Sequence, residues 1–247
     1  MLIMKITLNE AFSQYECLHG NAIPLSFIMD LNALKTLLLI IDVQNDFCPG
    51  GALAVNDGDD VISPLNALSG AMAEKGGRVA ATQDWHCEGH ISFASSHNGK
   101  KAGAVIDTPL VKNQVLWPDH CVQGTKGADF HSALDLKPVS LIIRKGYTAA
   151  LDSYSAFFEN DRKTKTGLDF WIGGLGIDTV IIGGIATDYC VFFSAMDCKK
   201  LGFNTVIADD AVRGVGFPEN SIEKAISEMK SAGIEFLSSN KILDGLK

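Results

Sequence analysis

The chain has 247 residues, of which 47% are hydrophobic, so it is long enough to bury one large core. It carries 21 Lys and Arg against 29 Asp and Glu, a net charge of −8, which argues against the broad basic surface that binds nucleic acid or anionic lipid. The purest apolar run, residues 37–41, is far shorter than the ~20 residues that span a bilayer. We therefore expect a soluble protein with neither a nucleic acid nor a membrane as its partner.

The six cysteines are scattered along the chain and include no CxxC pair. Because a domain of this length does not need disulfides for stability, we expect reduced thiols and a cytoplasmic protein.

The first 28 residues show neither helical nor alternating periodicity, and no basic segment precedes an apolar stretch, so a secretory signal is not indicated. We interpret residues 1–28 as an N-terminal appendage, whose presence in the natural product the sequence leaves open, and residues 29–247 as one domain.

Beyond the appendage, strand and helix patterns alternate. The continuous apolar run at 37–43 is typical of a strand buried on both faces of a parallel sheet, and residues 59–75 then follow a helical period, with Pro64 in the first turn. Later helices are predicted at 187–201, with Thr187 as N-cap and Gly202 just past the end, and at 218–232. The further predicted strands are 78–83, 139–144, 179–185, 204–208 and 234–237.

This alternation predicts an α/β fold with three α-β-α layers, in which helices cover both faces of a single doubly wound parallel sheet of about six strands. The connection at 84–137 is unusually long and contains five of the six histidines. Connections of that length in a compact domain are usually functional.

Four reactive side chains lie at the ends of predicted strands. Asp42 is near the end of the first strand, Asp84 and Lys145 come just after the second and third, and Cys190 is in the helical turn after the fourth. Parallel sheets build their sites at the carboxyl ends of the strands, so we expect these residues to converge on one edge. A lone cysteine on a helix is more often a small core residue. Here, however, the glycine-rich turn at 183–188 and the helix N-terminus can expose a thiol and favour its thiolate.

Asp42 follows five apolar residues and is expected to be buried, which requires a partner. Lys145 occupies the equivalent place on another strand. The alternative is a structural ion pair, or Arg144 in the inner position. Together with Cys190, however, Asp42 and Lys145 provide a nucleophile, a group that moves its proton and a cation that tunes both.

A second cluster consists of Asp84 and His86, two residues apart, together with His120. One carboxylate and two imidazoles suit a divalent ion such as Zn, Fe or Mn. His90 is a possible fourth ligand or a neighbour of the ligands. The alternative for each histidine is an ordinary hydrogen-bonded core residue.

Six fragments, in order, closely resemble the nicotinamidase/pyrazinamidase family of the isochorismatase-like hydrolases. The resemblance runs from about residue 37 to the C-terminus. The fragments are IDVQNDFCPGG at 41–51, DWH at 84–86, WPDHCVQG at 117–124, RKG at 144–146, DSYSAF at 152–157 and GIATDYCV at 184–191.

The resemblance implies a catalytic triad of Cys190, Asp42 and Lys145. It also implies an oxyanion hole formed by the backbone N–H groups of Ala186 and Cys190, with a cis peptide bond before Ala186.

For the rest of the site, the resemblance implies one divalent metal ion, zinc ahead of iron or manganese. The ion is held by Asp84, His86 and His120, and family members differ in whether a histidine like His90 also binds it. Aromatic walls around the substrate ring are implied at Phe47, Trp117 and Tyr154.

The implied function is hydrolysis of nicotinamide, and also of pyrazinamide, to the acid and ammonia through a Cys190 thioester, as a step in NAD salvage. The partner is then a small neutral molecule, and the oligomeric state stays open. The alternatives are another hydrolase of the superfamily, such as an isochorismatase or an N-carbamoyl amidohydrolase, or a non-catalytic metal-binding module. A Rossmann dinucleotide site is disfavoured because no GxGxxG follows the first strand.

Overall fold

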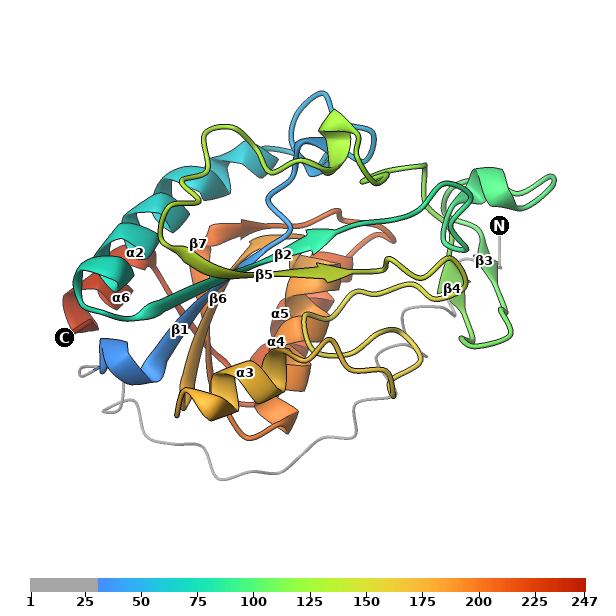
Figure 1. The fold of residues 1–247 in the computed structure, drawn as a ribbon. Coiled ribbons are helices and arrows are strands. Elements are labelled where there is room, and N and C mark those ends of the chain that lie inside the picture. The colour runs from blue at the N-terminus through green and yellow to red at the C-terminus, as the bar shows by residue number, and fades with distance from the viewer. Residues whose placement is uncertain (1–30) are drawn as a thin grey trace.

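Six parallel strands form the central sheet of the computed structural model, which describes residues 31–247 (Figure 1). The predicted appendage at 1–28 lies outside the described residues. All six predicted strands are present, in the sheet order β5-β2-β1-β6-β7-β8. Their bounds are β1 Thr36–Ile41, β2 Arg78–Asp84, β5 Val139–Lys145, β6 Thr179–Ile185, β7 Asn204–Arg213 and β8 Glu235–Leu237.

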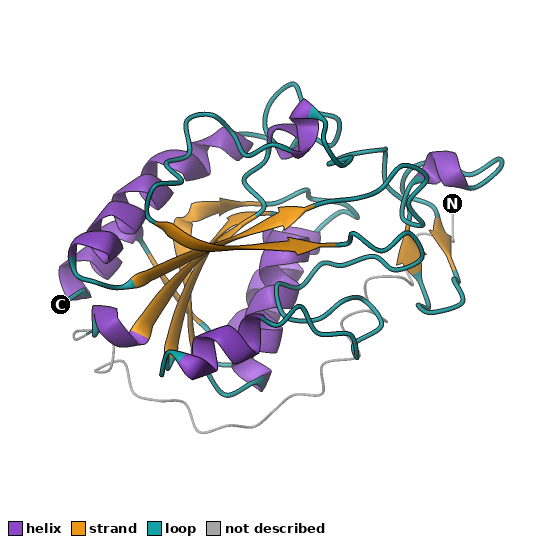
Figure 2. Ribbon diagram, viewed as in Figure 1, coloured by secondary structure: helices purple, strands orange, loops and turns teal. Residues whose placement is uncertain are grey.

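Helices cover both faces of the sheet, which confirms the predicted three-layer α/β fold (Figure 2). On one face lie α2 (Ile62–Glu74) and α6 (Ser239–Gly245). On the other face lie α3 (Leu168–Gly174), α4 (Phe192–Lys200) and α5 (Ser221–Ser231). Within the described part of the chain, no helix combines the length and apolar character needed to cross a membrane.

The helix predicted at 187–201 begins differently. Thr187–Val191 form a π-helical turn that runs into α4, and Ala186, with an extended backbone, occupies the N-cap position. The prediction of Thr187 as N-cap is therefore wrong, because the π-helical turn already includes Thr187 and the cap lies one residue earlier. The other end agrees with the prediction, since Gly202 follows the cap residue Leu201 in a left-handed conformation, φ 94°.

Four short elements were not predicted: α3, α6 and an antiparallel pair formed by β3 (Val105–Ile106) and β4 (Gln114–Val115). The pair lies inside the long 84–137 connection. These segments are too short to show a period of their own, so their structure depends on tertiary contacts.

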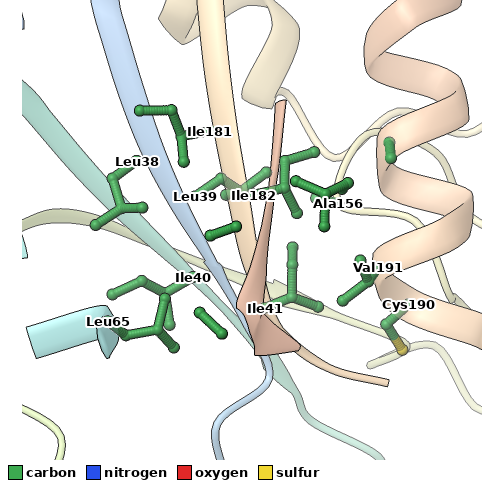
Figure 3. Packing of buried hydrophobic residues seen from close by; sticks show 14 of the residues in the cluster. Leu38, Leu39, Ile40, Ile41, Leu65, Ala156, Ile181, Ile182, Cys190 and Val191 are labelled. Carbon is green, nitrogen blue, oxygen red and sulfur yellow. The ribbon is translucent and has the colours of Figure 1, made fainter. Parts of the chain in front are cut away.

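The core is densest around β1, whose six residues are all buried. Successive side chains point to opposite faces, so Ile40 packs beside Leu65 of α2, while Ile41 faces Val191 at the start of α4 (Figure 3). Cys190 lies at the edge of the same apolar cluster.

The strand order reverses at β1. The chain proceeds from β1 to β2 and β5 on one side and then returns to β6 on the other side. Gly184 permits the close pairing of β6 with β1, because a Cβ at this position, φ 127°, would lie 2.1 Å from the Ile41 carbonyl oxygen. A crevice therefore opens outside the carboxyl ends of β1 and β6, where α/β sheets bind their ligands.

Replacing Leu38 by alanine tests the packing of β1. We expect a loss of about 2–5 kcal/mol in the free energy of unfolding, because the fully buried side chain leaves a cavity. Leu34→Ala is the matched control: Leu34 is 65% exposed, so its loss should cost less than about 0.5 kcal/mol. Urea unfolding measures both, and equal effects would contradict the described core.

Candidate active site

The site begins at Asp42, directly after β1. Its side chain is fully buried and its backbone lies in the left-handed region, φ 47°, which aspartate tolerates better than most residues. The Thr82 hydroxyl donates to Asp42 Oδ1 at 2.7 Å, and Asp42 Oδ2 lies 2.8 Å from Lys145 Nζ. The carboxylate is thus held from two neighbouring strands.

Lys145, at the end of β5, is the centre of the site. Its Nζ contacts Asp42, Asp84 Oδ1, the Ser153 carbonyl at 3.1 Å and Cys190 Sγ at 3.4 Å. The contact to Asp84 follows from strand register, because the two residues are direct partners on β2 and β5.

Arg144 does not take the inner position. Its guanidinium stacks over the Trp85 ring at 3.8 Å instead, because successive residues of a strand point to opposite faces.

Lys145 stabilises the charged forms of Asp42 and Asp84 in the protein interior, and the two carboxylates stabilise its ammonium. Burial alone would lower the pKa of Lys145, but Asp42 and Asp84 raise it well above its usual value. Burial would likewise raise the pKa of Asp84, yet Lys145 and the two nearby imidazoles bring it well below its ordinary range. Burial raises the pKa of Asp42, although Lys145 opposes the shift. The ammonium is therefore charged at neutral pH.

Cys190 lies in the π-helical turn after β6, with 6% of its surface exposed. Burial holds the pKa of its thiol well above the usual value, although Lys145 acts to lower it. Sγ lies within 4.8 Å of carboxylate oxygens of both Asp42 and Asp84. The reactive set is therefore a neutral thiol beside a buried carboxylate and a buried ammonium.

The Ile185–Ala186 peptide bond before the turn is cis, as the resemblance implied. The Ala186 carbonyl accepts hydrogen bonds from the N–H groups of Tyr189 and Val191, both at 3.0 Å. These bonds fix the turn on both sides of Cys190. Both Ala186 and Cys190, the residues of the expected oxyanion hole, border the pocket described below.

Asp84, His86 and His120 form a buried cluster suited to a metal ion. Asp84 Oδ2 lies 3.6 Å from His86 Nε2 and 3.9 Å from His120 Nε2. Each histidine has its Nδ1 against a backbone carbonyl, Gly146 at 2.7 Å and Pro118 at 2.8 Å. When Nδ1 carries the proton, the Nε2 lone pair of each ring faces the carboxylate, so one oxygen and two nitrogens fit a divalent cation.

A glycine after Lys145 is needed for this arrangement. Gly146 has φ 61°, and a Cβ there would lie 2.5 Å from the His86 ring.

His90 lies next to this cluster. Its ring stacks on His86 with centroids 4.2 Å apart, and its Nε2 faces the Thr148 and Leu151 carbonyls at 3.1 and 3.2 Å. Its Nδ1 lies 2.8 Å from the Ser92 hydroxyl. Both ring nitrogens of His90 therefore have partners outside the cluster, whereas the Nε2 atoms of His86 and His120 face Asp84 Oδ2.

A pocket of about 380 Å³, measured to its open mouth, joins the thiol to the histidine cluster. The three expected aromatic walls all line the pocket, and the Trp117 indole N–H donates to the Tyr154 hydroxyl at 3.1 Å. The lining residues are Phe47, Leu53, Asp84, Trp117, His120, Asp152, Tyr154, Ala186, Tyr189, Cys190 and Val215.

Several residues that shape the site were missed by sequence reasoning. The Gln44 side chain forms a pair of 2.8 Å hydrogen bonds with the backbone N–H and carbonyl of Asp84, and the Thr82 hydroxyl holds Asp42. Both act through contacts between strands, which leave no signal in spacing. Asp152 also lines the pocket, and its place in the DSYSAF fragment gives no spacing signal that predicts this position.

Asp188, two residues before Cys190, holds the far wall of the pocket. Its buried carboxylate accepts hydrogen bonds from the N–H groups of Val215 and Gly216 and from the Ser221 hydroxyl. The Tyr189 hydroxyl donates to the Phe217 carbonyl at 2.6 Å. The turn that carries the thiol is thereby tied to the loop that faces the thiol.

Comparison with known proteins gives a consistent result. A family model described as the isochorismatase domain matches residues 36–241. Nicotinamidase of Acinetobacter baylyi is 47% identical over 83% of this chain and 94% of its own length. Nicotinamidase of Escherichia coli is 43% identical over 79% of this chain and 91% of its own length.

Solved structures agree with these matches. A nicotinamidase/pyrazinamidase of Acinetobacter baumanii superposes with a TM-score of 0.80 at 45% identity, covering 84% of this chain and 97% of the other. A relative from L. infantum in complex with nicotinate has a TM-score of 0.72 at 35% identity, over 88% and 98% of the chains. A pyrazinamidase of Pyrococcus horikoshii in complex with zinc has a TM-score of 0.68 at 36% identity, over 83% and 99%.

Replacing Lys145 by methionine tests the buried charges. Without the ammonium, Asp42 and Asp84 are buried and unpaired, so we expect a loss of about 3–5 kcal/mol in the free energy of unfolding near pH 8. The pKa values of both carboxyls should then rise, and a folded state that binds protons more tightly gains stability as the pH falls. The loss should therefore shrink at pH 5. Urea unfolding in EDTA at both pH values measures it.

Lys101→Met is the matched control, because Lys101 is exposed in a loop and should give a small effect at either pH. A Lys145→Met penalty that does not change between pH 8 and pH 5 would contradict the role of charge.

Proposed function

The chain belongs to the isochorismatase family, and on that premise we propose that it is a metal-dependent cysteine amidohydrolase that converts nicotinamide to nicotinic acid and ammonia and also accepts pyrazinamide. The observation that carries the proposal is the position of the Lys145 ammonium, which touches Cys190 Sγ, Asp42 and Asp84 at once. A thiol, its base and a cluster of metal-binding groups thereby face one small pocket. The curated relatives supply the substrate class.

In the first half of the reaction, Asp42 accepts the Cys190 thiol proton as Sγ attacks the carboxamide carbon. The carbonyl π electrons move to oxygen, and the N–H groups of Ala186 and Cys190 stabilise the resulting oxyanion. The Lys145 ammonium stabilises the Asp42 carboxylate before transfer and the sulfur as charge develops. A raised pKa suits Asp42 as a base, because it brings the carboxylate nearer in basicity to the thiolate.

In the second half, Asp42 returns the proton to the amide nitrogen, the C–N bond breaks and ammonia leaves a Cys190 thioester. Water then attacks the thioester while Asp42 takes its proton. Breaking the C–S bond releases the acid, and the thiol regains its proton from Asp42. The net reaction consumes one water and yields one carboxylic acid and one ammonia, with the protein unchanged.

The residues that would hold the metal ion are Asp84, His86 and His120, and we favour zinc over iron or manganese, as in the pyrazinamidase of Pyrococcus horikoshii. A metal ion held there would supply a Lewis acid for the ring nitrogen of the substrate, with the carboxamide then facing Cys190. His90 then acts as a neighbour of the ligands, since both its ring nitrogens already have protein partners.

The pocket suits a small aromatic amide. Phe47, Trp117 and Tyr154 supply flat apolar surfaces, and the lining carries neither lysine nor arginine. A neutral pyridine carboxamide needs no positive surface, which agrees with the net charge of −8. We also infer a cytoplasmic enzyme of NAD salvage that acts on a free small molecule.

Cys190→Ala tests the covalent route. We expect ammonia release from nicotinamide to fall to background, because no nucleophile remains, while metal content and melting temperature stay close to wild type. The matched control is Cys198→Ala on α4, a buried thiol outside the pocket, which should keep its activity. A coupled ammonia assay measures both variants. Turnover near wild type in Cys190→Ala would rule out the thioester.

His86→Ala tests the metal site. We expect loss of the bound divalent ion and, with it, of nicotinamide turnover, because removing one of three ligands leaves an incomplete site. His97→Ala should keep both, since its Nε2 bonds only the Ile91 carbonyl among the described contacts. Elemental analysis of the purified proteins gives the metal content. Full metal occupancy in His86→Ala would show that the ion binds elsewhere.

A further inference from the structure

Glu159 is a buried acid that the proposed reaction does not use. It is 4% exposed, and among residues 31–247 its Oε2 finds no hydrogen-bond partner. A buried carboxyl without a direct cationic partner is costly, so its position calls for an explanation. It lies in the segment that follows the aromatic wall residue Tyr154.

The charged groups nearest to Glu159 belong to the active site. The Lys145 ammonium and the Asp152 carboxylate act on its charge, and the Ser153 side chain and the Gly146 backbone are close enough to oppose the rise in its pKa. Burial raises the pKa of Glu159 to about 7. The Ser153 and Gly146 contacts lie at the two ends of the loop that leaves β5 after Lys145 and returns to it.

The next residue, Asn160, holds the same returning segment. The Asn160 N–H donates to the Asp152 carbonyl at 2.8 Å, and the Asn160 side chain accepts from the Tyr154 N–H at 3.0 Å. Between these two points lies Ser153, whose carbonyl accepts from Lys145 Nζ at 3.1 Å. Of the four contacts described for that ammonium, this carbonyl is the one that comes from the backbone.

We propose that Glu159 is a positioning residue of the active site, which together with Asn160 fixes the Asp152–Tyr154 segment and thereby the Ser153 carbonyl on Lys145. The carbonyl directs one ammonium proton away from the two carboxylates, so that Nζ stays within reach of Cys190 Sγ. The same segment carries the Tyr154 wall and Asp152. The inference rests on the proposed function for its link to turnover, but the placement of Lys145 can be tested without a substrate.

The test compares Glu159→Ala with Glu159→Gln in metal-loaded protein. Alanine removes the buried carboxyl beside Ser153 and Gly146, so kcat for nicotinamide should fall by roughly tenfold, with KM changed less than about twofold. Glutamine keeps one acceptor oxygen and should restore kcat to within about threefold of wild type. The rate at which iodoacetamide alkylates Cys190, measured by peptide mass spectrometry, should fall in Glu159→Ala and recover in Glu159→Gln, in parallel with kcat.

Two further variants make the result specific. Asn160→Ala should lower kcat in the same way, and the double variant with Glu159→Ala should lose less than the product of the two single losses, because both act on one segment. Glu228→Ala on α5, a partly buried glutamate away from the pocket, should change neither readout.

The proposal is overturned if Glu159→Ala keeps the wild-type kcat and alkylation rate. It is also overturned if both Glu159 variants lose melting temperature and turnover equally while Cys190 alkylation stays unchanged, since that indicates a purely structural residue. Failure of the wild type to release ammonia from nicotinamide would refute the proposed function instead, and the alkylation comparison would still decide the role of Glu159.

Discussion

The contact of the buried Lys145 ammonium with Asp42 and Asp84 is the interaction on which the rest of the site depends. Two aspartates that are also buried would be unstable together without a cation between them, and the thiol beside them would face only negative charge. Because Lys145 lies between Asp42 and Asp84, both carboxylates can be kept in the interior. Asp42, the proposed base, and Asp84, the proposed metal ligand, are therefore parts of one charge network.

Sheet topology puts these groups together. Asp84 and Lys145 are direct partners on adjacent strands, and Asp42 follows the strand on the other side of β2. The reversal of strand order between β1 and β6 opens a crevice, and the turn after β6 places Cys190 in it. The contacts of Thr82, Gln44 and Asp188 then fix details that strand order alone leaves free.

Much of this could be predicted from the chain alone, for physical reasons that can be named. Fully buried strands leave continuous apolar runs, and a charged residue at the end of such a run, such as Asp42 or Lys145, needs a partner in the interior. The start of the helix after β6 could not be predicted, because a π-helical turn capped by Ala186 replaces an ordinary first turn there. The short α3 and α6 likewise depend on what they pack against, and Gln44 acts on the backbone of a residue forty positions away.

The two oxygens of Asp84 have different partners, and this connects the histidine cluster with Lys145. Oδ1 bonds the Lys145 ammonium, while Oδ2 faces the two imidazole nitrogens. A cation bound at Oδ2 would draw electron density from the carboxylate and weaken its hold on Lys145. The ammonium could then shift toward Asp42 and the Cys190 sulfur. Metal binding at the histidine cluster and the reactivity of the Cys190 thiol are therefore linked through the Asp84 carboxylate and the Lys145 ammonium.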